Sequence, residues 1–427
     1  MKIANLFHQK SKNVLSALFV VICIGTVVLY WVMAPESLYH TLGAFMLSYL
    51  VLWSVIFLWN DTSNTEKVKR FFLTTGSFAL TIGFFELLVA VQAIDFRIIF
   101  ETPVVEPWHH PANLKDPKLL HIHKPYDRWL WYGIEYQYDQ YGLRNDTDLE
   151  SADLIVIGDS FVEGLGVSAK DILTTQLAEQ LNRSVANIAQ SWYGPNQELE
   201  LLRRYGLKFD PKICVWVFYE GNDLADLQRY TMATRDWESF SKDFHSFRQR
   251  SFTKNAILAI RRMLPPIPNK NMFDRDRMKE QSGLYNSPSG QMIRLYFHDK
   301  GYYLPEDDRI AIKELSSVIG QAHKLCHAVG AKFFFVFAPT KFRVYRDFTE
   351  FSTEAQPRYW VINDLPQKLE AMVLENFPDG KFLDLTTALV EQAKQKPLLY
   401  FNYDTHWSAE GHHIAASAIA NIVRQWE

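Results

Sequence analysis

The sequence predicts an α/β fold with a mostly parallel sheet, preceded by three transmembrane helices. Three apolar segments of membrane-spanning length lie in the first hundred residues. From residue 153 onward, short apolar runs alternate with helical patterns, which is typical of a parallel sheet with helices on both faces. Several of these runs end in polar turns, and α/β sheets bind ligands at the carboxyl ends of their strands.

Residues 1–100 predict a membrane anchor in contact with lipid. Segments 14–34 and 38–59 contain no Asp, Glu, Lys or Arg, and segment 71–93 contains only Glu86. About 20 apolar residues suffice to cross the hydrocarbon core, and a signal peptide would explain only the first segment. A carboxylate in a membrane is costly and often functional. Alternatively, Glu86 lies near the outer interface, or is protonated and bonded to a neighbouring helix.

The distribution of basic residues predicts the topology. The N-terminus carries Lys2, Lys10 and Lys12. The loop between the second and third spans carries Lys67, Lys69 and Arg70, and the link between the first two spans has no Lys or Arg. Basic loops stay cytoplasmic. We therefore expect a cytoplasmic N-terminus and an extracytoplasmic, periplasmic remainder in a bacterial inner membrane.

The rest of the chain is predicted to form an α/β domain at residues 151–427. Residues 101–150, which lead from the membrane anchor to this domain, are called the approach segment. Apolar runs predict strands at 154–157, 185–188, 213–219, 332–338 and 381–385. Helical patterns cover 168–182, 195–207, 308–329, 365–377 and 408–426. The first helix opens with Ser-x-x-Asp, a variant of the capping box.

Residues of about 230–305 interrupt this alternation and predict an insertion. Its middle is basic and includes the amphipathic stretch FTKNAILAIRRMLPPIP. Such a segment suits anionic lipid headgroups or an anionic glycan. A solvated helical flap with ordinary surface charge is an equal alternative.

Charge and cysteine spacing argue against several classes of protein. The net charge is -3 and the sequence pI is about 6.5, which argues against a general nucleic-acid binder. The three cysteines, Cys23, Cys214 and Cys326, form no CxxC or zinc-like spacing, so no metal or other cofactor is expected. Cys214 and Cys326 could pair, but we favour two separate buried thiols.

Ser160 is the candidate nucleophile, since the run 154–157 ends in Gly-Asp-Ser followed by a Gly-rich turn. A serine nucleophile needs a base, a group that orients the base, and donors for the oxyanion. Asp404 and His406 stand two residues apart before the last helical pattern. In an extended loop such side chains point the same way. The alternative is that His406 merely packs against the last helix.

Two further turns carry groups that could donate hydrogen bonds to the oxyanion. Asn222 follows the strand at 213–219, and its amide can donate to an oxyanion. The stretch NIAQSWYGPNQ follows the strand at 185–188. Glycine there permits a close approach of the backbone to a ligand.

Together these motifs resemble the SGNH (GDSL-type) hydrolase superfamily over residues of about 137–427. GDSF, NIAQSWYG, GND and DTHWSAEGH are similar to its Ser, Gly, Asn and His blocks, and YDQYGLRND to a segment that precedes the Ser block. The resemblance implies a flavodoxin-like three-layer α/β/α sandwich and acyl-ester chemistry. It assigns Ser160 as nucleophile, His406 as base and Asp404 as its orienter. The implied oxyanion donors are the Ser160 N–H, a Gly-block N–H from Trp192 or Gly194, and the Asn222 side chain.

Two departures from the superfamily pattern point to a branch. Trp192 stands where the Gly block has glycine, and Asp-x-His replaces Asp-x-x-His. The shorter spacing and the stretch FAPTKFRVYRDF are similar to the alginate O-acetyltransferase-like branch. In that branch the Asp-His block can precede the serine, whereas here it follows. Candidate substrate-binding residues are Asp159, Phe161, Lys341 and Trp407, although a surface lysine that starts a helix is the plainer interpretation of Lys341.

Three functions follow as hypotheses. The first is an esterase that removes acyl groups from an extracytoplasmic glycan or lipid-linked sugar. The second is an O-acyltransferase of envelope or exported polysaccharide, which would use the same acyl-enzyme and a membrane partner that delivers the acyl group. The third is a catalytically silent polysaccharide-binding or scaffold protein.

Overall fold

The computed structural model describes residues 63–100, 122–123, 125–131, 133–235, 246–263, 280–298, 308–377, 379–396 and 398–426. The first two predicted spans, 14–34 and 38–59, lie outside these ranges. The chain divides into two compact units. Unit 1 comprises Met1–Val105 and Glu238–Asn269, and unit 2 comprises Glu106–Trp237 and Lys270–Glu427. Part of the predicted insertion therefore groups with the N-terminal segment.

The described part of unit 1 is helical. Its helices are α3 (Asn64–Ala90), α4 (Phe96–Ile99), α10 (Phe247–Arg250) and α11 (Phe252–Met263). Helix α3 begins earlier than the predicted span 71–93 because the Ser63 hydroxyl caps it, accepting from the Glu66 N–H. Among the described residues, one helix, Thr65–Ala90, is long and apolar enough to cross a membrane. Three such helices are not confirmed.

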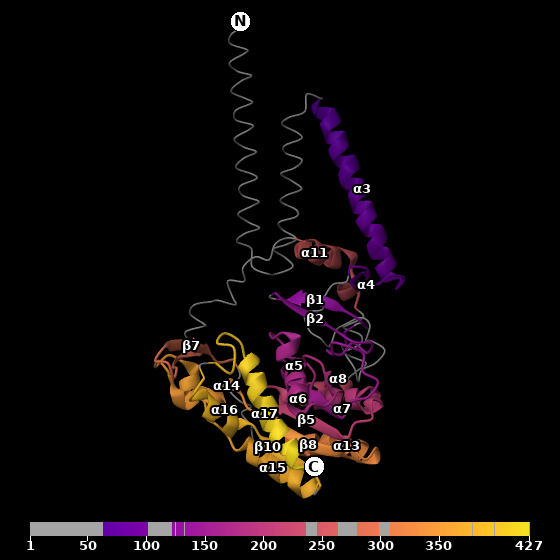
Figure 1. The fold of residues 1–427 in the computed structure, drawn as a ribbon. Coiled ribbons are helices and arrows are strands. Elements are labelled where there is room, and N and C mark those ends of the chain that lie inside the picture. The colour runs from indigo at the N-terminus through magenta and orange to yellow at the C-terminus, as the bar shows by residue number, and fades with distance from the viewer. Residues whose placement is uncertain are drawn as a thin grey trace. The chain divides into compact units, whose positions relative to one another are not determined.

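Unit 2 is built on a five-stranded parallel sheet in the order β10-β8-β5-β3-β4 (Figure 1). Its strands are β3 (Leu154–Gly158), β4 (Val185–Ala189), β5 (Ile213–Tyr219), β8 (Lys332–Ala338) and β10 (Lys381–Asp384). The predicted α/β class and all five predicted strands are confirmed. Counted along the chain, the order is 2-1-3-4-5, as in flavodoxin-like doubly wound sheets.

Helices cover both faces of this sheet because successive strand residues point to opposite faces. Ile155 and Ile157 share one core cluster with residues of α7 (Pro195–Arg204), α8 (Asp223–Arg235), α13 (Asp308–Ala328) and α15 (Leu365–Asn376). Leu154 and Val156 share the other with residues of α5 (Ser160–Glu163), α6 (Leu173–Leu181), α14 (Lys341–Tyr345), α16 (Thr386–Ala393) and α17 (Ala409–Gln425). Cys214 and Cys326 are buried free thiols, as favoured above.

The remaining elements are short. Hairpin β1 (Arg128–Trp131) and β2 (Ile134–Gln137) lies in the approach segment, and β6 (Ser282–Asn286), β7 (Met292–Tyr296) and β9 (Thr349–Glu350) form a three-stranded antiparallel sheet. 3-10 turns cover Ala169–Asp171, Gly206–Phe209, Arg346–Phe348 and Gln356–Tyr359. The predicted helix 168–182 is interrupted, because Ile172 is extended between the first of these turns and α6.

Candidate active site

Ser160 stands at the carboxyl end of β3, where the sequence places it. Asp159 caps the short helix α5 by accepting from the Phe161 N–H at 2.9 Å. A Cβ on Gly158 would lie 2.6 Å from Val162 Cγ2 and 3.1 Å from the Val217 carbonyl oxygen. Only glycine therefore lets the chain turn this tightly before Ser160.

His406 and Asp404 meet Ser160 in one chain of hydrogen bonds, although 246 residues separate the serine from the histidine. His406 Nε2 lies 2.8 Å from Ser160 Oγ. His406 Nδ1 lies 2.5 Å from Asp404 Oδ1, which also accepts from the His406 backbone N–H at 2.8 Å. The structure thus brings together the three residues that the sequence assigned to a catalytic triad.

Asp404 is ionised in this arrangement. Burial alone would raise the pKa of its carboxyl group. The hydrogen bonds and charge of His406, together with the charge of Lys341, outweigh burial and lower that pKa to about 2. A carboxylate facing Nδ1 holds the imidazole with Nε2 toward the serine hydroxyl.

Aromatic side chains form the wall behind the imidazole. Phe161 stacks on Tyr219 with ring centroids 3.9 Å apart, and its ring lies 5.1 Å from that of His406 and 5.0 Å from that of Trp407. Phe161, Trp407 and Asp159 are at most 2% exposed. These three candidate substrate-binding residues are therefore buried behind the triad and pack around it.

Lys341 is also buried, at 3% exposure. Its ammonium donates to the carbonyl oxygens of Phe401 at 2.9 Å and Asp404 at 2.6 Å, and lies 3.5 Å from that of Asn402. A lysine at the first position of α14 thus faces the loop that carries Asp404 and His406. Lys341 thus holds this loop in place, and its interpretation as a surface lysine that starts a helix is wrong.

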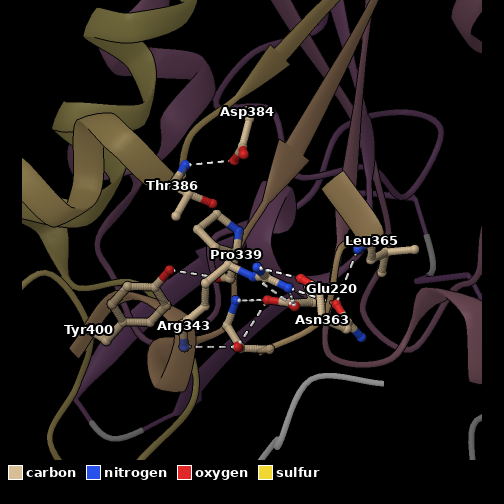
Figure 2. A network of polar contacts seen from close by, with 9 residues as sticks. Glu220, Pro339, Arg343, Asn363, Leu365, Asp384, Thr386 and Tyr400 are labelled. Atoms are coloured by element: carbon tan, nitrogen blue, oxygen red, sulfur yellow. Dashed lines mark hydrogen bonds and ion pairs between the residues drawn. The ribbon is translucent and has the colours of Figure 1, made fainter. Parts of the chain in front are cut away.

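A polar network fixes the segment that carries Lys341 (Figure 2). Glu220, directly after β5, accepts from the Thr340 N–H at 2.9 Å and from Arg343 Nε at 2.8 Å. Arg343 also reaches Asn363, and the Tyr400 hydroxyl donates to the Pro339 carbonyl at 2.6 Å. The start of α14 is therefore joined to the end of β5 and to the His406 loop.

Arg144 and Glu163 form a second support that sequence reasoning did not assign. The Arg144 guanidinium, 1% exposed, donates to the carbonyls of Glu163, Gly164 and Val167 at 2.9, 2.5 and 2.7 Å. The Glu163 carboxylate accepts from the Tyr138 hydroxyl at 2.7 Å and from the Ser191 N–H at 2.5 Å. The only sequence signal was the segment YDQYGLRND, which holds the serine loop through Arg144 and β4 through Asn145.

The candidate donors for the oxyanion differ in whether they already donate a hydrogen bond within the protein. Within the described part of the chain, the backbone N–H groups of Ser160 and Trp192 have no protein acceptor. The Gly194 N–H donates to Gln197 Oε1 at 3.2 Å, and a Cβ there would lie 2.6 Å from Asp226 Cβ. Gly194 thus serves helix capping and close packing. Asn222 Nδ2 donates to Asp226 Oδ2 at 2.6 Å, and the Asn222 side chain also interacts with the carboxyl group of Asp159.

A group of buried acids lies behind Asn222. Burial, the largest cause, raises the pKa of Asp159 to about 6 and that of Asp226 to about 7. Burial and the neighbouring carboxylates raise the pKa values of Glu198 and Asp223 well above their usual range. Asp159 and Asp223 belong to the GDSF and GND motifs, whereas Glu198 and Asp226 gave no signal in the sequence. No group of three or more His, Cys, Asp or Glu side chains within the described ranges is arranged to hold a metal ion.

Residues 295–427 match the family model of the SGNH hydrolase-like domain of acetyltransferase AlgX. That range includes Lys341, Asp404 and His406, and Ser160 lies outside it. No curated protein matches the chain significantly.

Solved structures of acylhydrolases and esterases are also similar. TesA is 12% identical, with 64% of this chain and 99% of TesA covered and a TM-score of 0.34. A carbohydrate esterase family 2 enzyme with its carbohydrate binding domain, from Corynascus thermopiles (Myceliophthora fergusii), is 12% identical, with 68% and 70% covered and a TM-score of 0.34. The acetyl xylan esterase Est2A from Butyrivibrio proteoclasticus is 13% identical, with 66% of each chain covered and a TM-score of 0.32. The family match confirms the resemblance to SGNH hydrolases, and to their acetyltransferase branch, that the motifs predict.

Proposed function

We propose that this chain is a membrane-anchored, extracytoplasmic serine esterase of the SGNH type. Its substrate is an O-acyl group on a glycan or a lipid-linked sugar. The observation that carries the proposal is the hydrogen-bonded chain from Ser160 Oγ through His406 to Asp404. A serine, an imidazole and an ionised carboxylate in this order are the parts that acyl transfer requires.

The first half of the reaction forms an acyl-serine. His406 Nε2 takes the proton of Ser160 Oγ as that oxygen attacks the ester carbonyl carbon. Asp404 stabilises the resulting imidazolium and keeps its Nδ1–H aligned. When the tetrahedral intermediate collapses, the C–O bond to the sugar breaks, and the imidazolium returns its proton to the departing sugar oxygen. The N–H groups of Ser160 and Trp192 and the amide of Asn222 are the donors for the oxyanion.

In the second half, water attacks the acyl-serine while His406 Nε2 takes one of its protons. The carboxylic acid leaves, and the proton passes to Ser160 Oγ. The enzyme is then regenerated with no cofactor consumed.

An O-acetyltransferase is the second candidate, favoured by the match to the AlgX domain. A sugar hydroxyl then replaces water in the second half, and a membrane partner delivers the acyl group. Two exposed aromatic side chains also favour a sugar acceptor. Trp192 is 62% exposed, and Tyr403, next to Asp404, is 56% exposed; sugar rings stack on such faces.

The proposal includes the predicted anchor and its topology. Three helices in residues 1–100 would hold the chain in a bacterial inner membrane with the N-terminus in the cytoplasm. The approach segment 101–150 and the three-layer catalytic domain 151–427 would lie in the periplasm. The apolar character of Thr65–Ala90 supports this anchor.

Hydrolysis of p-nitrophenyl acetate by the full chain in nanodiscs tests the proposal. We expect Ser160→Ala and His406→Ala to lower kcat/KM by about 10³-fold or more. Ser289→Ala and His413→Ala, at exposed positions, should behave as wild type. Acetylated oligosaccharide then replaces the nitrophenyl ester, and unacetylated oligosaccharide is offered as acceptor to separate esterase from transferase. Equal turnover by all five proteins would contradict the serine mechanism. Glycan binding without turnover in the wild type would favour a silent binding protein.

A further inference from the structure

Glu86 has an unusual setting for a carboxylate in an apolar helix. Its Oε1 accepts from the Ser251 hydroxyl at 2.8 Å, the Thr253 N–H at 2.9 Å and the Thr253 hydroxyl at 2.6 Å. These donors stand at the first turn of α11, where backbone N–H groups have no partner within the helix. Glu86 of α3 therefore caps α11 through Ser251 and Thr253, and Ser251 lies 165 residues later in the chain.

Apolar packing supports the same junction. Phe252, the first residue of α11, stacks on Phe85 with ring centroids 4.6 Å apart. It also lies 5.0 Å from Phe96 and 5.7 Å from Phe100. Figure 1 draws α11 beside the end of α3 that leads into α4. The start of α11 is thus fixed to α3 by both polar and aromatic contacts.

The position of Glu86 along α3 determines how deep in a bilayer Glu86 would lie. The apolar helix has 26 residues, so it is about 39 Å long, against about 30 Å of hydrocarbon. Glu86 lies four residues before its last residue, Ala90, which is about 6 Å along the axis. A spanning α3 therefore places Glu86, and α11 with it, at the boundary between hydrocarbon and headgroups.

The composition of the segment 246–263 suits this boundary. It contains no acidic residue, and its basic residues are Arg248, Arg250, Lys254, Arg261 and Arg262. Large apolar side chains are exposed at Phe247, 48%, and Ile260, 41%. A basic amphipathic helix with exposed apolar groups lies in the plane of a membrane interface and prefers anionic lipid.

We propose that α10 and α11 form an interfacial element that lies on an anionic lipid bilayer beside the membrane end of α3, with Glu86 as the residue that fixes its depth. The proposal rests on α3 spanning the membrane and is independent of the reaction at Ser160. It assigns a function to Glu86 and to the basic middle of the insertion.

Fluorescence quenching of single-cysteine probes in the full chain tests it. The chain is placed in vesicles of phosphatidylcholine and phosphatidylglycerol with Cys23 replaced by serine, and Cys214 and Cys326 are buried. An NBD label is attached at Ile260→Cys on α11, at Leu80→Cys on α3, or at Val361→Cys in unit 2, which is 74% exposed. Lipids that carry a doxyl group near the headgroup serve as quenchers.

We expect quenching at position 260 to exceed that at 361 by about threefold or more. Replacing phosphatidylglycerol with phosphatidylcholine should reduce the difference, and so should Glu86→Leu. Glu66→Leu, near the start of the same helix, should not. As a control for the spanning helix, the probe at position 80 is tested with lipids that carry the doxyl group deep in the acyl chain. If these lipids quench the probe at 80 while the probes at 260 and 361 are quenched equally by headgroup doxyl lipids, the proposal is overturned. A probe at 80 that no lipid quenches would overturn the spanning helix and this inference together, while ester hydrolysis reports separately on the catalytic domain.

Discussion

Trp192 is held at a backbone φ of 71°, a left-handed conformation that costs a residue other than glycine about 1–2 kcal/mol. Its side chain is nevertheless 62% exposed, so packing does not offset this cost. Strain of this kind persists where it serves a function. In the proposed reaction, the indole would be a platform for the sugar ring of the substrate, and the backbone N–H of Trp192 would face the oxyanion.

Replacing Trp192 separates these two roles. Trp192→Gly should change the free energy of unfolding by less than about 1 kcal/mol, because relief of strain offsets the entropy that glycine loses. Both Trp192→Gly and Trp192→Ala should raise KM for an acetylated oligosaccharide about tenfold and leave kcat/KM for p-nitrophenyl acetate unchanged. Steady-state kinetics on both esters provide the test. An equal loss on both would mean that Trp192 shapes the oxyanion site instead.

In the proposed reaction, catalysis depends on the loop that carries Asp404 and His406. Within residues 401–406 of this loop Tyr403 is exposed and the others are half-buried, and Lys341 holds the loop from α14 through the carbonyls of Phe401 and Asp404. The network around Glu220 and Arg343 keeps α14 in place in turn (Figure 2). A small shift of this loop would move His406 out of reach of Ser160.

Lys341→Met should therefore lower kcat about 10- to 100-fold and change KM for p-nitrophenyl acetate by less than about twofold. Lys341→Arg, which keeps the charge and donors, should recover part of kcat. Lys332→Met is the matched control, because the Lys332 ammonium donates to the Trp426 carbonyl on the exposed surface. A large rise in KM with kcat intact would instead indicate that Lys341 contacts the substrate.

Strands β3, β4 and β5 could be predicted because each is a short apolar run buried on both faces, and β8 differs only in its exposed first residue. Strand β10 lies at the edge of the sheet and is at most half-buried, and the alternation of strands and helices along the chain marked its position. Ser160, Asp404 and His406 could be predicted because turn chemistry and spacing mark them locally. Lys341 was named only as a candidate substrate-binding residue, and Arg144 was not recognised, because the partners of both are backbone carbonyls, which have no sequence signature. Glu86 was recognised as unusual, but its partners Ser251 and Thr253 lie in a distant segment that no periodicity connects to it.

At the scale of the whole molecule, the buried acids behind Asn222 couple stability to pH. Burial raises the pKa of Asp226 to about 7, above the usual value of about 3.9. Between these values the folded chain binds more protons than the unfolded chain, so stability falls as pH rises. The Asp159 pKa of about 6 acts in the same direction.

We therefore expect the unfolding free energy of the full chain in urea, followed by intrinsic tryptophan fluorescence, to be higher at pH 5 than at pH 8. Asp226→Asn should flatten this slope, since the amide cannot ionise. Asp364→Asn, at a carboxylate that stands on the surface, should leave the slope unchanged. Greater stability at pH 8 than at pH 5 in the wild type would show that these carboxylates are solvated and ionised in the folded chain.

The central claim is that Ser160 carries the acyl group between the two halves of the reaction. Its most direct test is to mix the full chain with p-nitrophenyl acetate, quench with acid within the first turnover, and locate the acetyl group by peptide mass spectrometry. We predict one acetyl group on Ser160 in the wild type, and none in Ser160→Ala or His406→Ala. Release of nitrophenol by the wild type with no acetyl on Ser160, or with acetyl on another side chain, would contradict the account.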